Sequence, residues 1–235
     1  MALRRVAALV TLDALGTLLE LRAPAPLLVQ ELRARGVAAS EDQAAQALAD
    51  EIAYYRAHHD MAVDAASLEL LRERCTAVLG EALARVGAGA HALALDELRD
   101  ALLAALRFRA YGEVPAALRA LRRAGHRLVV VSNWDVSLHD ALRETGLSEL
   151  VDGAISSAEA GFAKPDPRIF ARALELAGDD VEGWLHVGDS LEYDVAGALA
   201  AGIRPVLVAR GEHPAGVPGG VSVIGSLSEL TALAA

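Results

Sequence analysis

The polar residues most able to do chemistry in this sequence lie where short apolar runs end. Asp13 follows the first run, Ser132 and Asn133 follow another, Asp189 a third, and Lys164 comes after a fourth. If these runs are strands of an open parallel sheet, their carboxyl ends meet at the edge where such sheets bind ligands. Carboxylates, a hydroxyl and an ammonium gathered there could hold a cation, attack an electrophile and bind an anion. The alternative, that each is an ordinary surface residue, does not explain why they lie at strand ends.

The apolar runs have the length and flanking residues of buried parallel strands. Residues 6–12 form the first run, and Gly16 allows a sharp turn after it. From residue 113 onward, short apolar runs alternate with helical segments, a pattern typical of a doubly wound parallel sheet. Further strands are predicted near 128–131, 154–155, 184–187 and 205–208, and helices at 115–124, 137–144, 166–177, from 189 to 202 and from 226. Asp166 is expected to cap the helix at 166–177, with Pro167 at its first position.

Residues 21–109 differ from the rest because they contain no convincing strand. Prolines at 24 and 26 open one predicted helix, Ser40 to Gln43 form a capping box for a second, and two more are predicted at 65–86 and 94–109. We therefore expect an α/β core domain made of residues 1–20 and 111–235. A helical domain, residues 21–110, is inserted after the first strand.

The composition favours a protein that acts on a small molecule. A formal charge of −10 over 235 residues disfavours binding to nucleic acid or to an anionic membrane surface. No apolar run reaches the roughly 20 residues of a membrane span. The single cysteine, Cys75, is expected to be a buried thiol. The apolar stretch after Arg5 stops at Asp13 without a cleavage site, so we expect a cytoplasmic location.

Four segments together resemble the ordered motifs of the haloacid dehalogenase-like (HAD) hydrolase superfamily. They are Asp-Ala-Leu-Gly-Thr-Leu at 13–18, Val-Val-Val-Ser-Asn at 129–133, Lys-Pro-Asp-Pro at 164–167 and Gly-Asp-Ser-Leu-Glu-Tyr-Asp at 188–194. The resemblance implies a Rossmann-like α/β core, and the helical insertion falls where this family carries a four-helix cap domain. It does not cover the cap sequence, on which the choice of substrate would depend.

The resemblance also implies roles for individual residues. Asp13 would be the nucleophile that attacks phosphorus and forms an aspartyl-phosphate, which water then hydrolyses. Ser132 and the backbone amide of Asn133 would hold the phosphate oxygens, and Lys164 would supply positive charge. A structural ion pair with Asp189 is the simpler interpretation of Lys164, and both roles could hold together.

Magnesium is the cofactor that the resemblance implies. The carboxylates of Asp13 and Asp189 and the backbone carbonyl of Leu15 are similar to the hard oxygen ligands that Mg²⁺ prefers, with Asp194 next to them. The substrate would be a small phosphorylated metabolite. A halogenated one is the alternative.

Leu15 is where the sequence departs from phosphatases of this family, which usually have a second Asp there. Leucine can neither protonate a leaving alcohol nor activate water, and loss of a general acid typically lowers the rate by about 10² to 10⁴. One possibility is a phosphatase that is slow or prefers acyl and aryl phosphates. A second is a dehalogenase in which Asp13 displaces halide from a 2-haloacid, although that branch usually has Tyr at this position and lacks a Gly188-Asp189 pair. The third is a binding or regulatory protein without turnover.

Three histidines are not expected to be metal ligands or catalysts, although contact of His58 or His59 with a substrate is an alternative. His58 and His59 are adjacent on a predicted helix and point apart, which makes them poor joint metal ligands. His186 lies inside a predicted strand and is expected to be a core residue.

Overall fold

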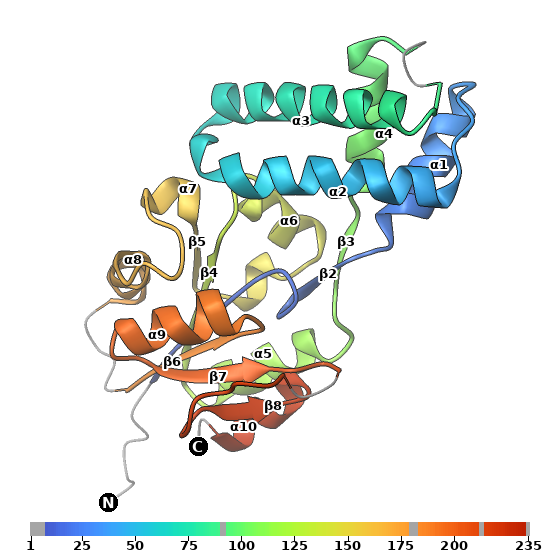
Figure 1. Ribbon diagram of the computed structural model, residues 1–235. Coiled ribbons are helices and arrows are strands. Elements are labelled where there is room, and N and C mark those ends of the chain that lie inside the picture. Colours follow the sequence, from blue (N-terminus) through green and yellow to red (C-terminus); the bar gives the residue numbers. More distant parts are fainter. Residues whose placement is uncertain (1–7, 90–92, 179–182, 212–213, 234–235) are drawn as a thin grey trace, which may run out of the picture. The chain divides into compact units, whose positions relative to one another are not determined.

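The computed structural model describes residues 8–89, 93–178, 183–211 and 214–233, so residues 6 and 7 of the predicted first strand lie outside the described residues. The chain divides into two compact units (Figure 1). One unit joins the residues up to Glu20 to those from Ala110 onward, and the other is Leu21–Arg109. The first strand thus shares a unit with the second half of the chain, and a helical unit is inserted between them.

The larger unit is built on a six-stranded sheet whose paired strands run parallel. Its strands are β1 (Ala8–Leu12), β4 (Arg127–Ser132), β5 (Gly153–Ser156), β6 (Gly183–Gly188), β7 (Arg204–Val208) and β8 (Ser222–Ile224). The order β5-β4-β1-β6-β7-β8 places β1 inside the sheet, with later strands added outward on both sides of it. The predicted α/β class is therefore confirmed, and the direction of the connections reverses next to β1.

Apolar side chains of the strands pack against helices of the same unit and are buried there. Leu9 of β1 and Val129 and Val131 of β4 share a buried cluster with Phe170. Phe170 lies on a helix whose apolar residues recur at helical spacing, so one of its faces is buried. The helices of this unit are α5 (Val114–Arg123), α6 (Leu138–Glu144), α7 (Ser157–Ala160), α8 (Arg168–Ala177), α9 (Ala196–Ala200) and α10 (Leu230–Leu233), with a π-helical turn at Leu191–Val195 and 3₁₀ turns at Ser148–Leu150 and Leu227–Glu229.

The helical unit has its own core of leucine and alanine side chains. Its helices are α1 (Pro24–Ala34), α2 (Glu41–His58), α3 (Ala65–Arg85) and α4 (Leu95–Ala105), with a 3₁₀ turn at His59–Met61. The predicted capping box of Ser40 and Gln43 is present, and Cys75 is buried as expected. None of the described helices is both long and apolar enough to span a membrane.

Several element boundaries differ from the predictions. The helix expected to reach residue 109 ends at Ala105, and Phe108–Ala110 forms β3, which pairs with β2 (Leu19–Leu21). Strands of three residues are too short to show a periodicity in the sequence. The two strands that pair also lie far apart along the chain. The helix expected from Asp166 begins two residues later, and the Asp166 carboxylate accepts a hydrogen bond from the Arg168 amide (2.9 Å). The prediction also missed β8, which follows a segment rich in Gly and Pro.

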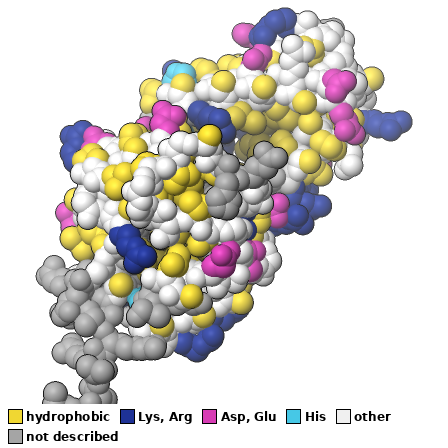
Figure 2. All heavy atoms as spheres, turned by 60° about the horizontal axis from the view of Figure 1, so that its bottom comes forward, with side chains coloured by type: hydrophobic (Ala, Val, Ile, Leu, Met, Phe, Trp, Pro, Cys, Tyr) yellow, Lys and Arg dark blue, Asp and Glu magenta, His cyan; other side chains and the backbone are white. Residues whose placement is uncertain are grey.

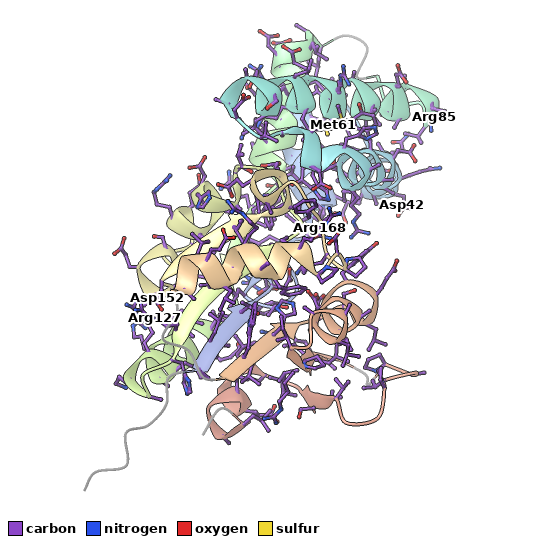
Figure 3. The ribbon with its side chains drawn as sticks, turned by 90° about the vertical axis from the view of Figure 1, so that its left-hand side faces the viewer. Asp42, Met61, Arg85, Arg127, Asp152 and Arg168 are labelled. Carbon is purple, nitrogen blue, oxygen red and sulfur yellow. The ribbon has the colours of Figure 1, made fainter. Side chains whose placement is uncertain are left out.

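The charged side chains on the surface are of mixed sign. Acidic and basic residues are interspersed over the described part of the face drawn in Figure 2. At the amino ends of β4 and β5, Asp152 lies close to Arg127 (Figure 3) and accepts a hydrogen bond from the Leu128 amide (2.8 Å). The polar residues singled out in the sequence lie at the opposite, carboxyl ends of the strands.

Candidate active site

Asp13 stands at the carboxyl end of β1. Its backbone N–H donates to the Val187 carbonyl (2.9 Å), which extends the pairing with β6 beyond the strand. The side chain is buried, and its Oδ1 accepts hydrogen bonds from Ser132 Oγ (3.0 Å) and Lys164 Nζ (2.7 Å). Parallel pairing of β1 with β4 brings Ser132 to this edge. The fold therefore gathers three of the residues singled out in the sequence.

Lys164 is the only lysine in the chain, and its side chain is only 2% exposed. Its ammonium lies 2.7 Å from Asp13 Oδ1 and 2.6 Å from Asp194 Oδ1. The simpler interpretation of this lysine paired it with Asp189, but its ion pairs are formed with the two buried carboxylates. Lys164 thus connects the end of β1 with the turn that follows β6.

Asn133 holds the loop that carries Lys164. Its carboxamide accepts a hydrogen bond from the Lys164 amide (2.7 Å) and donates one to the Lys164 carbonyl (2.9 Å). Two hydrogen bonds to the same residue restrain both position and orientation of the loop between α7 and α8. The resemblance implies a role for the Asn133 backbone amide, whereas this contact of the side chain has no signal in the sequence.

Three carboxylates form a cluster that could hold a metal ion. Asp13, Asp189 and Asp194 each offer an oxygen within 4.8 Å of the others. Two glycines permit this approach, because a Cβ on Gly16 would lie 2.1 Å from Asp189 Oδ2 and a Cβ on Gly188 would lie 2.1 Å from Asp194 Cγ. Gly16 also has a φ of +88°, which other residues rarely adopt. The cluster therefore depends on glycine at both positions.

The acidic cluster carries more negative charge than Lys164 balances. Partial desolvation by the surrounding protein, together with the charges of Asp13 and Asp194, raises the pKa of the exposed Asp189 to about 7, and burial raises the pKa of Asp13. Burial would lower the pKa of Lys164, but its two carboxylate partners outweigh burial and raise it. Lys164 in turn holds the pKa of Asp194 below its usual range despite burial. Three carboxylates and one ammonium have a formal charge of −2, which suits a divalent cation.

His186 is a core residue, as expected, but it also contacts the site. Its Nε2 lies 3.0 Å from Asp194 Oδ1 and its Nδ1 lies 3.0 Å from Thr11 Oγ1. The imidazole is almost fully buried, and burial lowers its pKa. Both ring nitrogens are used, so His186 orients the carboxylate that holds Lys164. The sequence offers one indication that His186 contacts the site. It lies two residues before Gly188 on β6, and the two residues are therefore on the same face of the strand.

Leu15 lies on the turn after Asp13, and the residue is 39% exposed. On the same turn, Gly16 lines a pocket of about 290 Å³ together with Tyr111, Asp189 and Arg210. The pocket opens to solvent beside the carboxylate cluster. A leucine at this point offers no proton to a bound ligand.

A buried carboxylate at the reversal point of a parallel sheet, paired with a buried lysine and flanked by carboxylates that could hold a cation, is typical of the ligand-binding edge of a Rossmann-like core. The model of the haloacid dehalogenase-like hydrolase family matches residues 7–202 of this chain. The chain belongs to this family, as the four motifs indicated.

Curated relatives include several phosphatases. Haloacid dehalogenase-like hydrolase domain-containing protein 3 of Bos taurus is 46% identical over 97 residues, which cover 41% of this chain and 39% of that protein. The plasmid phosphoglycolate phosphatase of Cupriavidus necator is 39% identical over 124 residues, covering 51% and 53%. The phosphoserine phosphatase of Thermus thermophilus is 38% identical over 109 residues, covering 46% and 44%. The chain thus spans roughly two fifths to one half of these relatives.

Solved structures share the fold over nearly the whole chain. The L-2-haloacid dehalogenase from Xanthobacter autotrophicus has a TM-score of 0.69 and 20% identity, covering 97% of this chain and 98% of that one. A HAD phosphatase from Thermococcus onnurineus has a TM-score of 0.63 and 24% identity, covering 96% and 97%. This likeness concerns the fold, which dehalogenases and phosphatases share.

Proposed function

We propose that this protein is a Mg²⁺-dependent phosphatase that hydrolyses a small phosphorylated metabolite through a phosphoenzyme on Asp13. The observation that carries the proposal is the position of Lys164, whose ammonium contacts Asp13 and Asp194, the two buried members of the carboxylate cluster. A nucleophile, a cation and an acidic metal-binding group are combined there. The phosphatases among the curated relatives support the same reaction class.

The residues at the site fit a magnesium ion. Asp13, Asp189 and the backbone carbonyl of Leu15 would hold it, with Asp194 beside them. Support comes from the three carboxylate oxygens within 4.8 Å of one another and from the exposure of Asp189, which leaves one side open to a substrate. When bound, the ion supplies the positive charge that allows an anionic carboxylate to approach a phosphate dianion.

Each residue at the site has a separate role in the proposed reaction. A carboxylate oxygen of Asp13 attacks phosphorus, and the bond from phosphorus to the leaving oxygen breaks with its electron pair on that oxygen. Ser132 and the backbone amide of Asn133 hold the phosphate oxygens, while Lys164 offsets the negative charge. Water then attacks the phosphorus of the aspartyl-phosphate, which releases phosphate and regenerates the Asp13 carboxylate.

Leu15 restricts the substrates that turn over fast. Since leucine provides no proton, the leaving oxygen has to depart as an anion, and this is easier for acyl and aryl phosphates than for alkyl phosphates. We expect kcat/KM to fall steeply from p-nitrophenyl phosphate to glycerol phosphate. Equal values for the two substrates would refute this preference and indicate a general acid elsewhere in the chain.

The helical unit Leu21–Arg109 is proposed to be the cap domain that selects the substrate, in a cytoplasmic enzyme. It is inserted after the turn that carries Asp13, where the family places its cap. Exchanging these residues for the helical insertion of a relative with a known substrate should shift substrate preference. An unchanged preference would assign selection to the core.

The first experiment is hydrolysis of p-nitrophenyl phosphate with Mg²⁺ and with a chelator. Asp13→Asn and chelation should each abolish turnover, whereas Asp140→Asn, an exposed control on α6, should retain it. Halide release from 2-chloropropionate is measured in parallel. Halide release without phosphate hydrolysis would establish a dehalogenase instead, and turnover of neither compound would favour a binding protein.

A further inference from the structure

Arg210 is a charged residue that the proposed mechanism does not use, although it follows β7 at the same edge of the sheet. Its guanidinium donates hydrogen bonds to the backbone carbonyls of Gly16 (3.2 Å) and Thr17 (2.7 Å). Both carbonyls belong to the turn that begins at Asp13. A side chain from the last part of the sequence is thus attached to the turn that carries the nucleophile.

The guanidinium is itself held by two further groups. One terminal nitrogen lies 2.5 Å from Glu113 Oε1, and the guanidinium carbon lies 3.5 Å from the centre of the Tyr111 ring. A planar guanidinium can donate in several directions and stack on an aromatic face at once, which an ammonium cannot do. The side chain of Arg210 is therefore set in place by the protein before any substrate binds.

The turn requires such support because its geometry is tight. Gly16 has a left-handed backbone conformation and lies so close to Asp189 that a Cβ would overlap the carboxylate. The amides of Leu18 and Leu19 both donate to the Ala14 carbonyl (2.8 Å each), which closes the turn from within. The hydrogen bonds from Arg210 to the carbonyls of Gly16 and Thr17 add a restraint from a different segment of the chain. Because Gly16 contacts both Arg210 and Asp189, movement of the turn would change the distance between the Asp13 segment and Asp189.

We infer that Arg210 is a positioning residue that fixes the turn from Asp13 to Thr17 and so sets the nucleophile opposite Asp189. Its kinetic consequence rests on the proposed phosphatase function. A misplacement of about 1 Å at a reacting centre can cost about 10²-fold in rate, while a small substrate still binds. Loosening the turn should therefore lower kcat and leave KM nearly unchanged.

The kinetic test compares Arg210→Lys and Arg210→Gln with the wild type, using p-nitrophenyl phosphate and Mg²⁺. Both variants should lose about 10- to 100-fold in kcat with KM within about twofold, because lysine keeps the charge but not the planar fork. Arg122→Lys is the matched control. Arg122 also donates to a backbone carbonyl, that of Glu149 (2.7 Å), and pairs with Asp152 (3.4 Å) at the amino end of β5, and its variant should keep full kcat.

A second readout does not depend on turnover. Hydrogen exchange of the Leu18 and Leu19 amides should be at least about tenfold faster in both Arg210 variants and unchanged in Arg122→Lys. Unchanged exchange, or full kcat in the Arg210 variants of an active enzyme, would overturn the inference. If the wild type hydrolyses no phosphate, the proposed function fails, and hydrogen exchange alone decides whether Arg210 holds the turn.

Discussion

Glu51 is a buried carboxyl group in the core of the helical unit, and its replacement by glutamine should stabilise this unit above neutral pH. Glu51 lies on α2, is only 3% exposed and has a hydrogen bond with Cys75. Burial raises the pKa of Glu51 to about 7 from the ordinary 4.5. The helical unit therefore contains an acid that is neutral at low pH and costly to ionise.

The size of the effect follows from the two pKa values. Because the folded pKa is the higher one, the stability contribution of this group is fully present below pH 4.5 and is lost as the pH rises through about 7. One pKa unit corresponds to about 1.4 kcal/mol, so the interval from 4.5 to about 7 amounts to about 3 kcal/mol. Glutamine has nearly the same volume and cannot ionise, so Glu51→Gln should escape this loss.

Thermal unfolding followed by circular dichroism between about pH 5 and about pH 8 measures the difference. At the alkaline end the melting temperature of the helical unit should be about 12 to 24 °C higher in Glu51→Gln than in the wild type, because about 3 kcal/mol shifts a unit of this size by about 4 to 8 °C per kcal/mol, and the difference should shrink toward pH 5. Glu81→Gln, an exposed position on α3, is the control and should follow the wild type. A difference that does not change with pH, or a less stable variant at pH 8, would refute the argument.

Three further predictions concern the site. Because Lys164 is the only lysine, ¹⁵N-lysine labelling should give one side-chain ammonium signal. Its pKa should lie above the ordinary 10.5 and should be lower in Asp194→Asn than in the wild type, and a pKa below 10.5 would contradict the ion-pair geometry. Gly188→Ala places a Cβ 2.1 Å from Asp194 Cγ and should lower kcat by at least about tenfold, whereas Gly89→Ala, with nothing within 4 Å, should not; full activity of the first variant would count against the cluster. Leu15→Asp should raise turnover of glycerol phosphate by about 10- to 100-fold, and no gain would show that the missing acid is not what limits the rate.

The residues at the strand ends could be found from the sequence because their placement follows from local rules. Asp13 and Ser132 each come after an apolar run, and parallel strands end at one edge of a sheet. The need for glycine at position 16 could also be predicted locally. The chain turns sharply directly after a strand, and glycine allows the left-handed backbone found there.

Other features depended on partners that are distant in sequence. The ion pairs of Lys164 with Asp13 and Asp194 join three separate loops, and no local pattern distinguishes them from a pair with Asp189. Asn133 was assigned only through its backbone amide, although its side chain fixes the lysine loop. The pairing of β2 with β3 was missed because strands of three residues are stabilised by their partner and not by their own sequence.

The alternation of strands and helices, the helical insertion and the chemical types at the sheet edge can be read from the sequence, since these depend on apolar periodicity, capping and turn residues. Which charges meet depends on the folded arrangement of the chain. The contacts of Lys164, His186 and Arg210 arise where different segments converge, and their energies depend on burial and on distances of a few ångströms, which no stretch of sequence carries alone.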